Sequence, residues 1–137
     1  MKTWVLDASA VLRFTDREAG FELLLSLYEK AARGEVRLLM SAVIWGEVVH
    51  AVMKRTGARA EPILENLAAL PMEVIPVDAA AATDAARFKR RYSLPYADSF
   101  AGALTLQVPG GASLLTADND FRTLPPGTID IEFLPGK

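Results

Sequence analysis

Short apolar runs alternate along this chain with longer segments of helical periodicity, and this alternation constrains the fold more than any other feature. Residues 3–6 form a β-prone run without polar alternation, as expected of a strand buried on both faces. Residues 36–40, 72–77 and 113–116 are predicted to be further strands. Residues 129–134, where acidic and apolar side chains alternate, are a possible fifth strand at a sheet edge.

The segments between these runs have the spacing and the end signals of helices. The predicted helices cover residues 21–34, 41–55, 61–70, 78–92 and 95–108. Strands that alternate with helices predict an α/β fold, a three-layer α/β/α sandwich with a mainly parallel central sheet. With 137 residues, 51% of them apolar, and no repeat or long linker, we expect one domain over residues 1–137.

Composition excludes several classes of function. The chain has no cysteine, which excludes disulfides, zinc-thiolate sites and thiol nucleophiles and suits a reducing compartment. No apolar run approaches the roughly 18 residues that cross a bilayer, and Asp7 falls where a signal peptide would need its apolar segment. We therefore expect a cytoplasmic protein without a membrane partner. The net charge of -2 gives no global sign of a nucleic-acid binder, although acidic catalytic residues can mask a local basic rim.

Four acidic residues stand where apolar runs give way to turns or helices: Asp7, Glu47, Asp98 and Asp118. Asp7 and Asp118 follow predicted strands, and parallel sheets bind ligands beyond the carboxyl ends of their strands. A carboxylate in apolar surroundings costs several kcal/mol or more unless a partner compensates its charge. One divalent cation would compensate several of these acids at once, so we predict that they form a metal site.

Each acid also has a simpler explanation. Asp7 can cap the helix that follows it, and Asp98 can be an ordinary acid in the first turn of a helix. Glu47 lies in an apolar helix, which predicts a buried carboxylate paired with an arginine as the alternative to a metal site. Asp118 can belong to a turn, and Asp120 can replace it as the fourth acid.

In chain order, these acids and their neighbours are similar to a known family. The segments that carry the similarity are Val5-Leu6-Asp7-Ala8-Ser9-Ala10, then Ser41 with Glu47, then Leu94-Pro95-Tyr96-Ala97-Asp98-Ser99, then Leu115-Thr116-Ala117-Asp118-Asn119-Asp120-Phe121. Together they resemble the PIN-domain ribonucleases, specifically the VapC toxins of toxin–antitoxin pairs. The resemblance spans nearly the whole chain. It implies a PIN-like fold and a metal-dependent endoribonuclease that hydrolyses RNA phosphodiester bonds.

An acidic cluster without cysteine or paired histidines fits Mg²⁺, with Mn²⁺ as a second candidate, because these hard ions prefer oxygen ligands. The resemblance implies that Asp7 and Asp98 are the principal metal ligands. Glu47 and Asp118 would complete the catalytic site, directly or through waters.

Other polar residues near these acids are weaker candidates. Ser9 and Thr116 can hydrogen-bond the acids or a substrate phosphate, or can simply cap helices. His50 shares roughly the helix face of Glu47, but a metal site needs no histidine base. The basic run 89–91 can contact a phosphate backbone or can be a solvated helix end.

The resemblance also implies two macromolecular partners, an RNA substrate and a cognate antitoxin protein. Leu23 and Leu27 widen the apolar face of the helix predicted at 21–34 and offer a docking surface for the antitoxin, with homodimer packing or core burial as alternatives.

Two other functions remain open from the sequence. A haloacid-dehalogenase-like phosphohydrolase would use Asp7 as a covalent nucleophile, but its signature needs an aspartate where Ser9 stands. A catalytically inert binding module would use the acids only as helix caps.

Overall fold

The computed structural model describes residues 1–136 and contains a five-stranded sheet of order β3-β2-β1-β4-β5. Every neighbouring pair of strands is parallel. The strands are β1 (Lys2–Leu6), β2 (Val36–Ser41), β3 (Glu73–Ile75), β4 (Ser113–Thr116) and β5 (Asp130–Phe133). All five predicted strands are present, and β5 forms one edge of the sheet as predicted. The third is shorter than its predicted range of 72–77.

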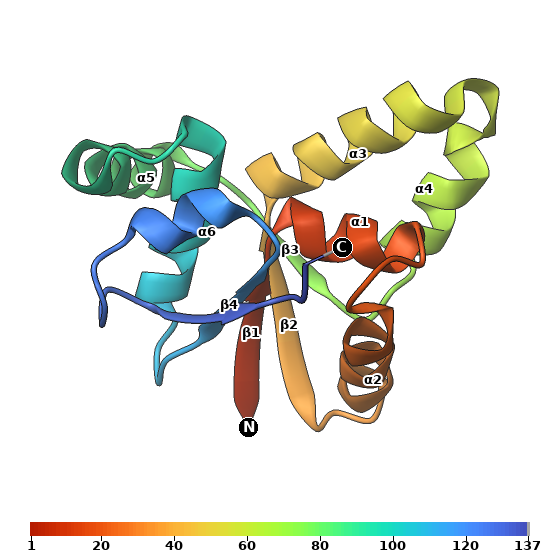
Figure 1. Cartoon of the computed structure of the whole chain (residues 1–137), viewed down its shortest axis with the longest axis horizontal. Helices are drawn as coiled ribbons and strands as arrows, with labels where there is room; N and C mark the ends of the chain where they lie inside the picture. Colours follow the sequence, from red (N-terminus) through yellow and green to blue (C-terminus); the bar gives the residue numbers. More distant parts are fainter. Residues whose placement is uncertain (137) are drawn as a thin grey trace.

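Helices cover both faces of the sheet, which confirms the predicted three-layer sandwich (Figure 1). The first layer contains α1 (Ala8–Thr15), α2 (Phe21–Ala32), α3 (Ala42–Thr56) and α4 (Ala60–Ala68), with the short 3₁₀ turn η1 (Gly57–Arg59) between the last two. The second layer contains α5 (Ala79–Tyr92) and α6 (Tyr96–Gln107). Right-handed connections between parallel strands require this division, because the chain reverses direction across the sheet after β3.

The middle strands explain the apolar runs of the sequence. β1 pairs with both β2 and β4, so it lies inside the sheet, and helices cover the sheet on both faces (Figure 1). Val5, Leu6, Leu114 and Leu115 are fully buried. A strand in this position has no solvent-facing side on which polar residues would alternate.

The order of the strands creates a switch point between β1 and β4. The chain leaves β1 toward β2 and β3, then returns to β4 on the other side of β1. Such a point leaves a crevice at the carboxyl ends of the two strands, where ligands bind in α/β proteins. The backbone N–H of Asp7 donates to the carbonyl of Leu115 over 3.0 Å, which joins the two strand ends.

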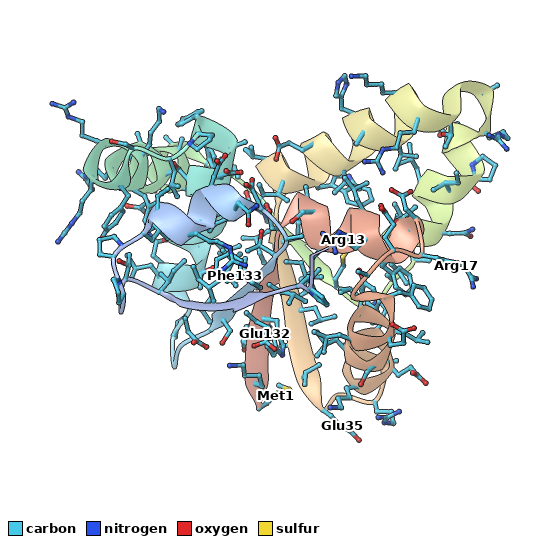
Figure 2. The ribbon with its side chains drawn as sticks, viewed as in Figure 1. Met1, Arg13, Arg17, Glu35, Glu132 and Phe133 are labelled. Atoms are coloured by element: carbon cyan, nitrogen blue, oxygen red, sulfur yellow. The ribbon has the colours of Figure 1, made fainter. Side chains whose placement is uncertain are left out.

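The last residues of the chain secure this edge of the sheet. The N–H of Leu134 donates to the carbonyl of Thr116 over 2.8 Å. One guanidinium nitrogen of Arg13 donates to the carbonyls of Ala19 and Pro135, at 2.8 and 2.7 Å. Figure 2 shows Arg13 on α1 beside the C-terminal end of the chain. The segment after β5 is therefore tied both to β4 and to the first helical layer.

The predicted antitoxin-docking leucines belong to the core instead. Leu27 is 4% exposed, and Leu23 is partly buried against the core cluster. The prediction was wrong because α2 packs against α1 as well as β2, so a wider stripe of this helix is covered. No helix within residues 1–136 has both the length and the apolar character needed to cross a membrane.

Candidate metal centre

Asp7 follows β1 directly and is almost completely buried, with 3% of its surface exposed. Its Oδ2 accepts two hydrogen bonds, from Thr116 Oγ1 at 2.8 Å and from Ser9 Oγ at 3.0 Å. Although Asp7 occupies the N-cap position of α1, its side chain makes no capping bond. Helix capping therefore does not account for this aspartate.

The two hydroxyl groups are themselves fixed by the backbone after β4. The N–H of Ala117 donates to Ser9 Oγ over 2.9 Å, and the N–H of Asp118 donates to Thr116 Oγ1 over 3.0 Å. Each hydroxyl has one proton to donate, and Asp7 Oδ2 lies within hydrogen-bond distance of both, while Ser9 Oγ and Thr116 Oγ1 lie 3.2 Å from each other. The carboxylate of Asp7 is thus held in one orientation by groups from two ends of the chain.

Burial raises the pKa of Asp7, and the charge of Asp118 raises it further. The hydrogen bonds from Thr116 and Ser9 act in the opposite direction, because they stabilise the ionised form. Burial is the largest of these influences. A positive charge beside Asp7 would favour its ionised form.

Asp98 lies in the first turn of α6 and is 7% exposed. Burial, followed by the negative charges of Asp7 and Asp118, raises its pKa from 3.8 to about 8. A helix start favours the ionised carboxylate by only ~0.3 to 1 kcal/mol, and burial and repulsion act in the opposite direction. Ordinary helix-start chemistry does not explain an acid in this position.

Asp118 is the N-cap of the 3₁₀ turn η2 (Asn119–Thr123), which follows β4, and Asp120 lies within this turn. One carboxylate oxygen from each of Asp98, Asp118 and Asp120 lies within 4.8 Å of the other two. Asp118 Oδ1 also accepts from the N–H of Asp120 at 2.8 Å, which is the turn-forming bond expected for this aspartate. Asp118 therefore stabilises the turn and also lies close to Asp98. Both alternatives for the fourth acid therefore lie beside Asp98.

Glu47 is exposed, which corrects the prediction of a buried glutamate. The helix α3 buries one face only, through Ile44, Val48 and Val52, and Glu47 lies outside it. Among the ion pairs of residues 1–136, none involves Glu47, so the alternative of a buried pair with arginine is excluded. Partial burial raises the pKa of Glu47, and the charges of Asp7 and Asp118 raise it further, which places this acid in the field of the cluster.

The remaining polar candidates lie outside the cluster of acids. His50 is exposed on α3. Lys89 Nζ donates to the carbonyl of Leu94 over 2.9 Å, and the Arg91 guanidinium lies 5.5 Å from the ring centre of Tyr92. Lys89 therefore ties the end of α5 to the loop before α6.

The donor set fits a hard divalent cation. Asp98 Oδ2 is the one buried side-chain oxygen or nitrogen without a hydrogen-bond partner in the part of the chain that the structure describes. Burying such a group without a partner is costly, and a cation would supply the missing interaction. The acids offer oxygen ligands only, which suits Mg²⁺ or Mn²⁺ better than zinc.

Comparison with known proteins identifies the family and the fold. A family model described as "PIN domain" matches residues 4–125. VapBC2 from Rickettsia felis, bound to a promoter DNA fragment, superimposes with a TM-score of 0.74 at 13% identity, over 97% of this chain and 99% of that one. DNA-bound VapBC from Salmonella typhimurium gives 0.73 at 16% identity, over 97% and 98%. PAE2754 from Pyrobaculum aerophilum gives 0.61 at 20% identity, over 94% and 89%. No curated protein sequence matches the chain.

Proposed function

Because the chain belongs to the PIN domain family, we propose that it is a divalent-metal-dependent endoribonuclease and the toxin of a toxin–antitoxin pair. The observation that carries this proposal is the carboxyl group of Asp98, which is buried with an unpaired Oδ2. Its neighbours Asp118 and Asp120 each have a carboxylate oxygen within 4.8 Å of one carboxylate oxygen of Asp98. An arrangement that repels itself in the absence of a cation supports a metal centre rather than a structural role.

In this proposal Asp7 and Asp98 are the principal ligands of Mg²⁺, and Glu47 and Asp118 complete the site. A bound Mg²⁺ would stabilise negative charge on the phosphoryl oxygens and lower the pKa of a water molecule. Mn²⁺, which also accepts oxygen ligands, would serve in its place.

The hydroxyl groups of Ser9 and Thr116 orient the first ligand. Both donate to Asp7 Oδ2, which leaves Oδ1 free of them for a cation. Oriented ligands are needed because small errors in ligand position weaken both metal binding and the reaction. Ser9 and Thr116 are thus positioning residues in this proposal.

Hydrolysis would proceed by attack of a water oxygen on the phosphorus, with cleavage of the bond from phosphorus to the ester oxygen of the next nucleotide. The water loses a proton to an ionised carboxylate, and the leaving oxygen takes a proton from solvent. Glu47 is exposed and lies in the field of Asp7 and Asp118, so solvent reaches it without entering the core. We assign it as the acceptor of the water proton.

Family membership favours this function over the two alternatives from the sequence. A haloacid-dehalogenase-like mechanism needs the side chain of Asp7 free to attack phosphorus, and a second acid where Ser9 is found. An inert binding module does not need a buried acid, so it would not explain why Asp98 has a raised pKa and a buried oxygen without a hydrogen-bond partner.

A groove between α1, α2 and α4 supports the antitoxin part of the proposal. This open hollow of about 570 Å³ is lined by Phe14, Thr15, Arg17, Phe21, Leu25, Ile63, Asn66 and Leu67. Two of the similar structures are VapBC complexes. We assign the groove, in place of Leu23 and Leu27, to an amphipathic segment of the antitoxin, because apolar grooves between helices are typical sites for such segments.

Incubation of the purified protein with unpaired and duplex RNA oligonucleotides, with Mg²⁺ or with EDTA, tests the nuclease assignment. Cleavage is expected with Mg²⁺ and not with EDTA. A parallel preparation of Asp98→Asn controls for contaminating nucleases, and Asp84→Asn on α5 is the matched control for the loss of one carboxylate. Equal cleavage by wild type and Asp98→Asn would refute the proposed site.

A further inference from the structure

Tyr96 is the first residue of α6 and is 49% exposed. The large apolar side chains that are exposed in residues 1–136 are Met1, Leu25, Met53, Val74, Tyr96 and Leu106, and Tyr96 is the one aromatic residue in this set. It stands two positions before Asp98. At about 1.5 Å of rise per residue, the backbones of Tyr96 and Asp98 lie within one turn of each other, but side chains two positions apart point to different faces of a helix. The Tyr96 ring therefore does not face the Asp98 carboxylate.

The ring of Tyr96 is supported from within the protein. It packs edge to face on Phe100, with ring centres 5.0 Å apart and planes at 74°. Phe100 is 6% exposed, so the support is part of the core. One side of the Tyr96 ring is thus held, while half of its surface faces solvent.

The backbone at Tyr96 is fixed on both sides. Lys89 Nζ donates to the carbonyl of Leu94 over 2.9 Å, and Leu94 is 1% exposed. The N–H and the hydroxyl of Ser99 both donate to the carbonyl of Pro95, at 3.1 and 3.0 Å. A rigid aromatic group loses little conformational entropy when a ligand binds, which favours recognition.

We infer that Tyr96 is a stacking platform for an unpaired base of the substrate that flanks the cleavage point. This inference rests on the proposed ribonuclease function and deepens it, because it specifies a single-stranded segment as the substrate. Aromatic side chains bind single-stranded RNA by stacking on its bases, whereas the bases of a duplex are already stacked on one another. The net charge of the chain is -2, so its overall charge does not attract the RNA backbone, and the acidic cluster repels it. Base stacking on Tyr96 would contribute affinity that does not depend on charge.

Steady-state cleavage of an unpaired RNA oligonucleotide tests this inference. Tyr96→Ala is expected to raise KM by about 5- to 150-fold, the range found for loss of a base–aromatic stack, with little change in kcat. Tyr96→Phe and Tyr96→Trp keep a ring and are expected to retain the wild-type KM. Leu106→Ala is the matched control, because Leu106 is also exposed on α6 but lies near the other end of the helix.

A binding measurement separates stacking from other roles of Tyr96. RNA with 2-aminopurine near the cleavage point loses fluorescence when that base stacks, so wild type in EDTA is expected to quench it and Tyr96→Ala is not. Equal KM values for Tyr96→Ala and wild type, in a preparation that cleaves RNA, would overturn the stacking role and leave the nuclease assignment intact. An oligomeric state changed by Tyr96→Ala, with activity restored at high protein concentration, would assign the residue to a subunit interface instead. Absence of cleavage by wild type would refute the proposed function itself.

Discussion

Thr116 Oγ1 lies 2.8 Å from Asp7 Oδ2, although the two residues are 109 positions apart in the chain. The bond crosses the switch point between β1 and β4, and it fixes the carboxylate that the proposed function uses as a metal ligand. This contact connects the register of the sheet directly to the chemistry of the site.

Replacing Thr116 tests that connection. Thr116→Val keeps the shape of the side chain but removes its donor, and we expect RNA cleavage to fall by about 10- to 100-fold, as for other groups that orient metal ligands. Thr116→Ser keeps the hydroxyl and should retain most activity. Comparable losses in both variants would indicate a packing defect, and thermal melting would detect it.

Asp7→Asn and Asp98→Asn are expected to reduce RNA cleavage to background while the fold persists. Each change removes a charge from a buried, self-repelling group, so the melting temperature without metal should stay equal or rise. Cleavage assays and circular dichroism melts on the same preparations check both expectations. Wild-type cleavage by either variant would remove that residue from the ligand set.

The stability of the metal-free protein should decrease as pH rises. The pKa of Asp98 is raised from 3.8 to about 8, so between roughly pH 4 and 8 the folded chain keeps a proton that the unfolded chain has released. Each kcal/mol lost lowers the melting temperature by about 3 to 4 °C in a domain of this size. Melts in EDTA across this range measure the slope, which Asp98→Asn should flatten. Mg²⁺ added at pH 8 should restore stability by binding the folded state.

Glu47→Gln separates catalysis from stability. Because Glu47 is exposed and has no ion pair in residues 1–136, we expect a change in unfolding free energy of no more than about 0.5 kcal/mol. Cleavage should nevertheless fall, since the proposed proton acceptor is lost. Urea unfolding and kcat at saturating Mg²⁺ measure the two quantities. A loss of about 3 to 5 kcal/mol would reveal a buried charge pair instead.

Expression in a host without the antitoxin should arrest growth, and Asp98→Asn should relieve the arrest. Coexpression with the product of an adjacent reading frame should restore growth to cells that carry wild type. Leu25→Glu introduces a charge into the groove between α1, α2 and α4 and should weaken this protection, whereas Leu106→Glu on α6 should not. Protection that is equally strong against both variants would place the antitoxin elsewhere.

The sheet was predictable because its middle strands are buried on both faces. A run such as Val5-Leu6 has no polar alternation, and this pattern distinguishes a central strand from an edge strand such as β5. The convergence of Asp7 and Asp118 followed from the rule that parallel strands end at one edge. The hydrogen bonds from Thr116 to Asp7 and from the N–H of Ala117 to Ser9 depend on sheet register, which no local pattern specifies.

The errors have a common physical cause. Glu47 was predicted to be buried because its helix is apolar on most sides, and Leu27 was predicted to be available to a partner because its helix has a wide apolar face. How much of a helix is covered depends on the neighbouring helices, and the periodicity of one segment does not contain that information. The exposure of Tyr96 could not be predicted for the same reason, because an aromatic residue within an apolar segment is usually part of the core.

The hydrogen bond between Asp7 and Thr116 also determines when the acidic site can form during synthesis of the chain. A ribosome adds about 5 to 20 residues per second, so roughly 5 to 20 s separate the translation of these two residues. Until β4 has emerged and paired with β1, Asp7 lacks the hydroxyl of Thr116 and Asp118 is absent from the cluster. A growing chain therefore has no complete site, and the proposed ribonuclease would stay inactive until β4 and the residues after it have been made.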